Sequence, residues 1–187
     1  LEPDRSDLVG AGAIKKLAAD NKLRIKVDQT WGEKLPYSNS TFDLVYGRAV
    51  LHHAKDLKQL CKEASRVLKP NGMFIFTREH VISKHEDLNI FLENHPLHNL
   101  YGGENAYLLK EYKNAIIESG INLRFVLNPM WSDINLYPDT KKDIKKKIAN
   151  RLKISSLMLP DLLLYLYGAL SNTPGRLYSF VGQKNEA

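Results

Sequence analysis

The chain has 187 residues, of which 43% are hydrophobic and 26% charged, values that suit one ordinary globular domain. Its single cysteine, Cys61, excludes an internal disulfide framework and a zinc site built from cysteines. The net charge is +6, and residues 141–153 account for all of it, so a body that binds nucleic acid over its whole surface is not expected. The lone core-type thiol and the lack of a recognisable signal peptide favour a cytoplasmic protein.

The first part of the chain predicts a helix and then a strand. Residues 6–20 have helical character, although Gly10 and Gly12 weaken it. Leu23–Val27 alternates apolar and polar residues, which predicts a strand near the edge of a sheet, and the loop 28–34 follows.

The stretch from residue 33 to residue 76 predicts a strand, a helix and a second strand. Residues 41–46 are a short β-prone run after a turn-forming cluster. Apolar residues then recur at helical spacing from 56 to 68, and a Pro and a Gly follow the end of this helix. The run 73–76 reads as a buried strand, so the unit predicts a right-handed crossover in a parallel sheet.

Four short motifs follow one another along this stretch. They are Leu35-Pro36-Tyr37, Phe42-Asp43-Leu44-Val45, Val50-Leu51-His52-His53 and Arg66-Val67-Leu68-Lys69-Pro70-Asn71-Gly72. As an ordered set they resemble the class I S-adenosylmethionine (SAM)-dependent methyltransferases, and most closely the type 11-like branch that acts on small molecules. The resemblance implies an α/β, Rossmann-like fold: a mostly parallel sheet with an antiparallel C-terminal strand, in a single domain over residues 1–187.

The resemblance implies SAM as the cofactor and indicates where it would bind. In the family an acidic residue after the second strand binds the ribose hydroxyls, and Glu2 fits that place. Trp31 stands where many relatives have an Asp, and it either stacks on adenine or packs under its own loop. The residues expected to bind the cofactor are Glu2, Pro3, Trp31, Gly32, Glu33, Gly47, Arg48 and His52.

On the same plan, the first strand and its GxGxG loop would precede Glu2. Gly10-Ala11-Gly12 is a poor substitute, since no apolar strand precedes it. An open sheet without its first, central strand would expose two unpaired edges. The sequence is therefore expected to be the C-terminal part of a longer protein.

Polar residues after the run 73–76 predict the acceptor side of the site. They are expected to form a loop over the position of methyl transfer, or a simple solvated loop start. The candidate bases are His80, His53 and Glu79, in that order. The candidate acceptor-binding residues are Arg78, His98, Tyr101, Glu104 and Asn105. No metal site is expected, because His80, His95 and His98 are too loosely spaced.

The C-terminal part predicts a helix over 108–119, a strand over 121–127 and a terminal antiparallel strand over 177–182. A helical insertion, residues 133–173, lies between the two strands, with a basic stretch and then an apolar stretch over 157–170. We favour a helical cap over the acceptor cleft. Membrane-surface contact through residues 141–170 and an oligomer contact are the alternatives.

The expected reaction is methyl transfer from SAM to a small-molecule, sugar or lipid-linked acceptor. Gly47-Arg48-Ala49 stands where many amino-group and nucleic-acid methyltransferases carry an Asp/Asn-Pro-Pro-aromatic motif, so nucleic acid is a disfavoured acceptor. A nucleic-acid binder using the basic stretch is weaker still, because that stretch lacks interleaved aromatic residues. The main alternative is a non-catalytic, methyltransferase-like scaffold or binding module.

Overall fold

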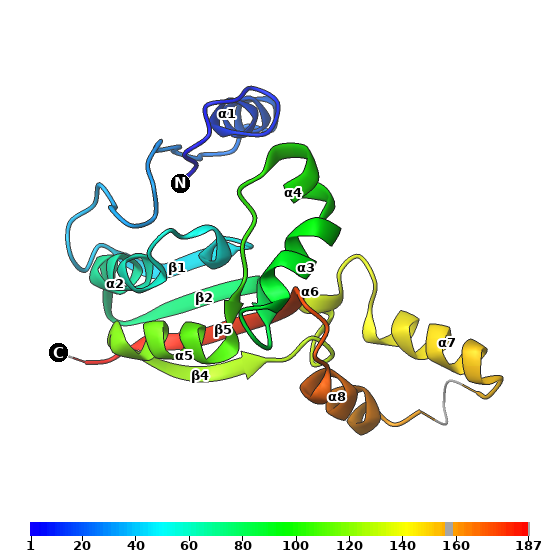
Figure 1. Cartoon of the computed structure of the whole chain (residues 1–187). Helices are drawn as coiled ribbons and strands as arrows, with labels where there is room; N and C mark the ends of the chain where they lie inside the picture. The colour runs from blue at the N-terminus through cyan, green and yellow to red at the C-terminus, as the bar shows by residue number, and fades with distance from the viewer. Residues whose placement is uncertain (156–158, 187) are drawn as a thin grey trace.

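The computed structural model describes residues 1–155 and 159–186. Within this part of the chain an open five-stranded sheet has the order β1–β2–β5–β4, and the short β3 pairs with β2 (Figure 1). The strands are Phe42–Arg48 (β1), Leu68–Ile82 (β2), Tyr107–Leu108 (β3), Ile121–Leu127 (β4) and Arg176–Lys184 (β5). β1 and β3 run parallel to β2, whereas β5 is antiparallel to both β2 and β4. This confirms the predicted α/β class, its parallel crossover and its antiparallel C-terminal strand.

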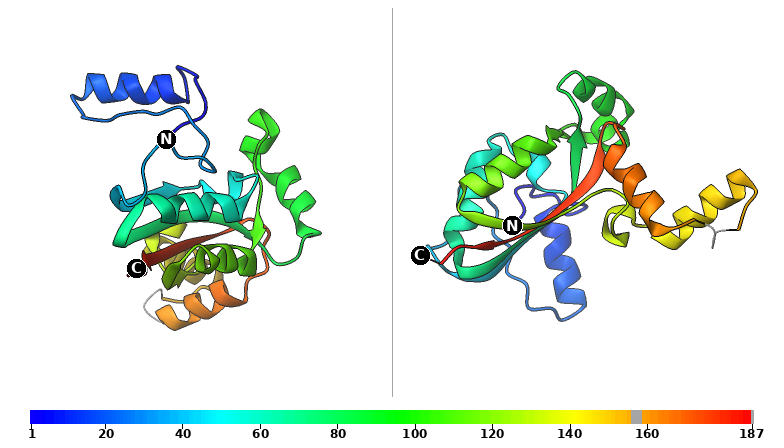
Figure 2. Two further views of the ribbon diagram at one scale, coloured as in Figure 1. Left: turned by 90° about the vertical axis from the view of Figure 1, so that its left-hand side faces the viewer. Right: turned by 90° about the horizontal axis from the view of Figure 1, so that it is seen from below.

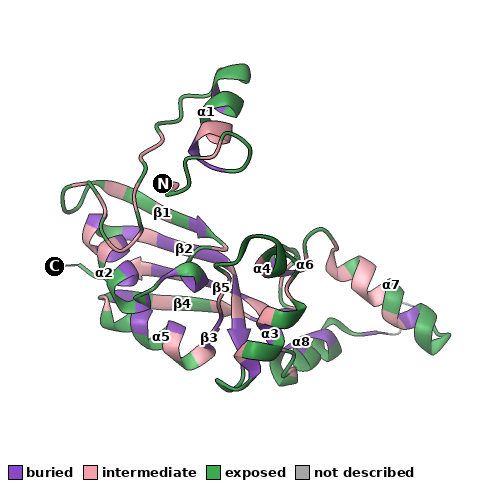
Figure 3. Cartoon of the chain, turned by 45° about the horizontal axis from the view of Figure 1, so that its top comes forward, coloured by how far each residue is buried: buried purple, intermediate pink, exposed green. Residues whose placement is uncertain are grey.

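Two helices, α2 and α5, lie side by side across one face of the sheet and enclose the main core (Figure 1). Phe74 and Phe180 from the strands and Tyr112 from α5 are fully buried there. Figure 3 shows that buried residues concentrate in β2 and β5 and in these two helices. The helices are α1 (Ala11–Asp20), η1 (Leu51–His53), α2 (Leu57–Val67), α3 (Asp87–Asn94), α4 (Pro96–Tyr101), α5 (Leu109–Glu118), α6 (Asp133–Leu136), α7 (Lys141–Leu152) and α8 (Asp161–Leu170).

The helix α2 begins and is anchored through its own polar side chains. Asp56 caps its N-terminus by accepting a hydrogen bond from the backbone N–H of Gln59 at 3.0 Å. Glu63 accepts from the backbone N–H of Leu35 at 2.8 Å, and Arg66 donates to the Leu35 carbonyl at 3.1 Å. The Glu63–Arg66 pair thus fixes the loop that leads into β1, which accounts for Arg66 in the family-like pattern.

The strand β2 is much longer than the predicted run 73–76. It continues to Ile82, although the sequence predicted a loop at residues 77–80, because β5 pairs with it on one side. The pairing contains a bulge between Phe76 and Glu79, where Arg78 adopts a left-handed backbone with φ of 63°. The Arg78 N–H donates instead to the Ser179 hydroxyl at 3.2 Å. The bulge therefore sets the direction of the residues that follow it.

The strand predicted at residues 23–27 is absent from the described structure, and this prediction was wrong. Leu23 and Ile25 are about half exposed, and their backbone N–H groups bond locally, to Ala18 and Leu23. An alternating pattern becomes a strand only when a neighbouring strand accepts its hydrogen bonds, and none of the described residues supplies one here. The Glu2 N–H donates a hydrogen bond to the Asp28 carbonyl at 3.2 Å, which brings the two ends of the segment 2–28 together.

The helices α7 and α8, within the predicted 133–173 insertion, form an arm that extends away from the sheet (Figure 2). Asp161 at the start of α8 pairs with Lys141 and Lys145 of α7. Residues 156–158 of the predicted apolar stretch lie outside the described residues. Across 1–155 and 159–186, none of the helices has the length and apolar character that crossing a membrane requires.

Candidate functional site

Two cavities adjoin at the C-terminal end of β1, where open α/β sheets bind their ligands. The larger has a volume of about 750 Å³ and the smaller about 470 Å³. Arg48, Ala49, His53 and Glu104 line both of them. Ala49 is held in a left-handed conformation with φ of 55°, and its N–H donates to the Thr77 carbonyl at 2.8 Å. The residues that line both cavities form a shared wall between them. A ligand in one cavity would therefore lie next to a ligand in the other.

The larger cavity gathers most of the residues that were expected to bind the cofactor. Trp31 is 58% exposed, with the Lys55 ammonium 5.5 Å from its ring centre, so its indole is open to a stacking partner. One carboxylate oxygen of Glu2 accepts from the Asp4 N–H at 2.9 Å. An open indole and a carboxylate are groups that suit an adenosine moiety. The expected cofactor residues that line this cavity are Glu2, Pro3, Trp31, Gly32, Glu33 and Arg48.

The other two expected cofactor residues, Gly47 and His52, are not part of the larger cavity's lining. Gly47 is buried, and a Cβ atom there would lie 2.4 Å from the Phe76 ring, so packing within the sheet requires the glycine. His52 is 1% exposed and lies on the wall of the smaller cavity.

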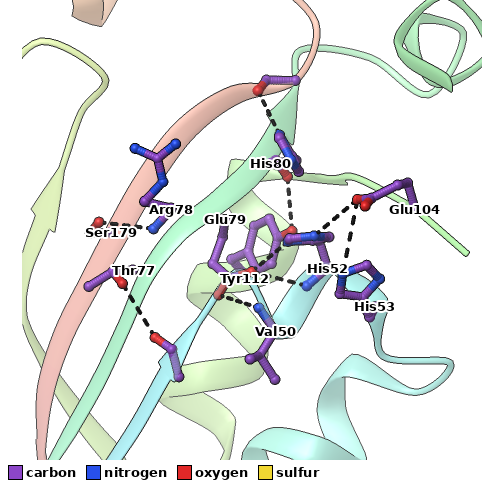
Figure 4. A network of polar contacts seen from close by, with 12 residues as sticks. Val50, His52, His53, Thr77, Arg78, Glu79, His80, Glu104, Tyr112 and Ser179 are labelled. Atoms are coloured by element: carbon purple, nitrogen blue, oxygen red, sulfur yellow. Dashed lines mark hydrogen bonds and ion pairs between the residues drawn. The ribbon is translucent and has the colours of Figure 1, made fainter. Parts of the chain in front are cut away.

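Glu79 is the centre of a buried polar network rather than an exposed base (Figure 4). It accepts hydrogen bonds from the backbone N–H groups of Val50 and His52, each at 3.1 Å. The His52 Nδ1–H also donates to it, at 2.8 Å. Because the carboxylate is fully buried and bonded to three donors, it cannot reach an acceptor molecule. This corrects the predicted role of Glu79: it positions η1 and the His52 ring.

His52 links Glu79 to a second carboxylate, that of Glu104. The His52 Nε2 atom lies 3.3 Å from Glu104 Oε2, and both side chains are nearly buried. The His52 hydrogen bond is the main cause that lowers the pKa of Glu104 to about 2. Burial alone would lower the pKa of His52, but its hydrogen bonds to Glu104 and Glu79 raise it.

His80 remains a candidate base on the smaller cavity. Its Nδ1–H donates to the Gly175 carbonyl at 2.9 Å, which leaves the lone pair on Nε2. Its ring centre lies 4.7 Å from that of His52 and 5.0 Å from that of His95. Burial, aided by the charge of His52, lowers the pKa of His80 to about 4, so the ring is neutral near pH 7.

The predicted acceptor-binding residues divide between the cavities and the surface. Arg78 lines the smaller cavity, and its guanidinium donates to the carbonyls of Ile134 and Tyr137 at 3.0 and 2.9 Å. Glu104 and Asn105 line the larger cavity, from the loop before β3. Tyr101 and His98 line neither of the two, and Tyr101 is 75% exposed.

Some lining residues escaped the sequence analysis. Ala49, Lys55 and Tyr107 all line the larger cavity. The Tyr107 hydroxyl donates to the Ala54 carbonyl at 2.6 Å, which ties β3 to the segment after η1. The left-handed backbone of Ala49 has no sequence signal, since glycine or asparagine would be the usual residue there.

The arm α7–α8 lies away from this site. Neither helix contributes a lining residue to the two adjoining cavities. The segment around α6 does approach the site, through the bonds that it accepts from Arg78. The arm therefore forms no part of the wall of the smaller cavity.

Comparison with known proteins agrees with this geometry. Residues 7–76 match the family model described as a methyltransferase domain. A sarcosine/dimethylglycine N-methyltransferase from Halorhodospira halochloris is 44% identical over 63 residues, which cover 34% of this chain and 22% of that protein. Residues 7–76 are therefore similar to a methyltransferase domain. The curated relatives are matched over a quarter of their own length or less.

Solved structures match the fold over nearly the whole chain. A (4+2)-cyclase matches with a TM-score of 0.59 and 16% identity, over 94% of this chain and 62% of the cyclase. A geranyl diphosphate C-methyltransferase from Streptomyces coelicolor, in complex with Mg²⁺, geranyl diphosphate and S-adenosyl-L-homocysteine, matches with a TM-score of 0.56 and 14% identity. That match covers 91% of this chain and 57% of the enzyme. At these identities the likeness concerns the fold.

Proposed function

We propose that the protein transfers a methyl group from SAM to a small-molecule, sugar or lipid-linked acceptor. The observation that carries this proposal is the pair of cavities that share Arg48, Ala49, His53 and Glu104. The larger would hold the cofactor, with Glu2 toward the ribose and Trp31 toward the adenine. Its volume of about 750 Å³ lies in the usual range for small-ligand sites, roughly 300–1,000 Å³.

The smaller cavity would hold the acceptor. Bound SAM supplies an activated methyl group, so the protein's main work is to align the acceptor and exclude water. His53 lies on the shared wall, with Nδ1 donating to the Gly103 carbonyl at 2.9 Å, so its Nε2 is free to accept a proton. Arg48 and Arg78 favour an acceptor that carries a negative group.

The relatives' names support a small acceptor without identifying it. They include sarcosine/dimethylglycine and sterol methyltransferases. A scaffold or binding module without transfer activity is the alternative, because one fold serves many functions, as the cyclase neighbour illustrates.

The test is calorimetric titration of S-adenosyl-L-homocysteine, followed by transfer of labelled methyl from SAM to small acceptors. A version extended upstream through the expected glycine loop is measured in parallel. Saturable binding and labelled product support the enzyme. Binding by neither form contradicts the proposal and leaves the scaffold.

For the arm we propose contact with an anionic membrane surface, which fits a lipid-linked acceptor. α7 is strongly basic, and α8 exposes Leu162, Leu163, Tyr167 and Leu170 by 51% to 77%. Cosedimentation with vesicles containing phosphatidylserine tests this, with phosphatidylcholine vesicles as the control. Equal binding to both vesicles, or to neither, contradicts an electrostatic contact.

A further inference from the structure

Four histidines surround Glu104, and only His52 and His53 among them are neighbours in the sequence. They form two groups with it, His52–His53–Glu104 and His80–His95–Glu104. Within each group the atoms able to bind a metal lie within 4.8 Å of one another. Loose spacing in the sequence gave no sign of this cluster, because the fold brings η1, β2, α4 and the loop before β3 together.

Two of these imidazole rings are oriented as metal ligands usually are. The Nδ1–H of His52 donates to Glu79 at 2.8 Å, and that of His53 donates to the Gly103 carbonyl at 2.9 Å. In the neutral form of each ring, the bond places the proton on Nδ1 and leaves the lone pair on Nε2. Metal-binding histidines almost always donate their other ring nitrogen to a carboxylate or a carbonyl in this way.

Both free nitrogens approach the same carboxylate oxygen. Glu104 Oε2 lies 3.3 Å from His52 Nε2 and 4.0 Å from His53 Nε2 (Figure 4). The Glu104 side chain is only 9% exposed, and among the described residues Oε2 has this contact with His52 but no well-aligned hydrogen bond. Lone pairs that face each other repel, and a positive charge between them turns this repulsion into attraction. A proton on His52 Nε2 would satisfy only the contact between His52 and Glu104. A metal ion would bind all three atoms, which are His52 Nε2, His53 Nε2 and Glu104 Oε2.

We propose that His52 Nε2, His53 Nε2 and Glu104 bind a divalent transition-metal ion, which leaves His80 rather than His53 as the candidate base. Two imidazoles and one carboxylate suit Zn²⁺, Fe²⁺ or Mn²⁺ better than Mg²⁺, which prefers oxygen ligands alone. Three protein ligands leave coordination positions open toward the shared wall of the two cavities. If the proposed function holds, an oxygen or nitrogen atom of the acceptor takes one of these positions.

Binding of Co²⁺ and Zn²⁺ to the metal-stripped protein tests the site without any methyl transfer. Co²⁺ is followed by visible absorption and Zn²⁺ by calorimetry. We expect one equivalent of either ion, and at least tenfold weaker binding in both Glu104→Gln and His53→Gln. His85→Gln is the matched control, because His85 is 68% exposed and pairs with Glu111 instead. Millimolar Mg²⁺ should not displace Co²⁺.

Circular dichroism melting checks that each variant folds. His53→Gln is the variant that should disturb folding least, because the His53 side chain is 42% exposed. The site is overturned if the folded wild type binds neither ion. It is equally overturned if Glu104→Gln and His53→Gln bind as the wild type does, since the ion would then be held elsewhere. Neither result bears on the methyl-transfer proposal, which SAM binding and labelled product decide separately.

Discussion

The His52 ring donates a hydrogen bond to Glu79 at 2.8 Å, and both side chains are almost completely buried. The same carboxylate accepts from the backbone of η1, so one side chain of β2 holds the segment that follows β1. The chain thereby fixes the C-terminal ends of two neighbouring strands to each other at the candidate site.

Replacing this buried carboxylate should destabilise the fold more than any surface change. Glu79→Ala leaves three donors without a partner, so we expect a loss of about 3–5 kcal/mol in the free energy of unfolding. Glu118→Gln, which breaks an exposed pair with Lys58, should cost at most about 1 kcal/mol. Urea denaturation measures both, and similar losses would contradict the anchoring role of Glu79.

Gly47 is required by the Phe76 ring. Gly47→Ala places a Cβ atom 2.4 Å from that ring, so we expect a cost of about 1–3 kcal/mol in the free energy of unfolding. Combining it with Phe76→Leu should recover part of this cost, which a double-mutant cycle measures. Additive effects would show that the two positions do not conflict.

Trp31 should contribute to cofactor affinity by stacking. Trp31→Ala should weaken S-adenosyl-L-homocysteine binding by about 1–3 kcal/mol, the usual value for a nucleobase stacked on an aromatic ring. Trp131→Ala is the control, since Trp131 has similar exposure but packs against Tyr165 of α8. Calorimetry compares the two variants. An unchanged affinity in Trp31→Ala would leave Trp31 as a loop residue only.

The thiol of Cys61 should be inert in the folded protein. Burial in the core raises the pKa of Cys61 to about 12 from an ordinary value of 9.0. A thiol reagent at pH 8 should therefore label it only in denaturant. Because the folded pKa lies above the unfolded one, the thiol's contribution to stability is complete below pH 9 and is lost as the pH rises from 9 toward 12. Between pH 9 and pH 12 the melting temperature of Cys61→Ala should therefore fall less than that of the wild type.

The sequence by itself determined the crossover unit from β1 through α2 to β2 and its resemblance to a methyltransferase domain. Its strand and helix periods, its cap at Asp56 and its terminating Pro70 and Gly72 are local signals, so no distant contact is needed to interpret them. The family's plan also predicted that Trp31, Gly32 and Arg48 lie at one site, and all three line the larger cavity, although Trp31 departs from the usual Asp.

Only the tertiary structure decided the rest. Residues 23–27 carry a strand pattern but no described neighbour to pair with, and strand formation depends on that pairing. Glu79 and Glu104 are both acidic residues near the predicted acceptor site, yet one is an anchor and the other lines the cavities. What separates them is the bulge at Arg78 and the placement of η1, which set burial and hydrogen-bond partners across long distances in the chain. Such distances leave no periodic signal in the sequence.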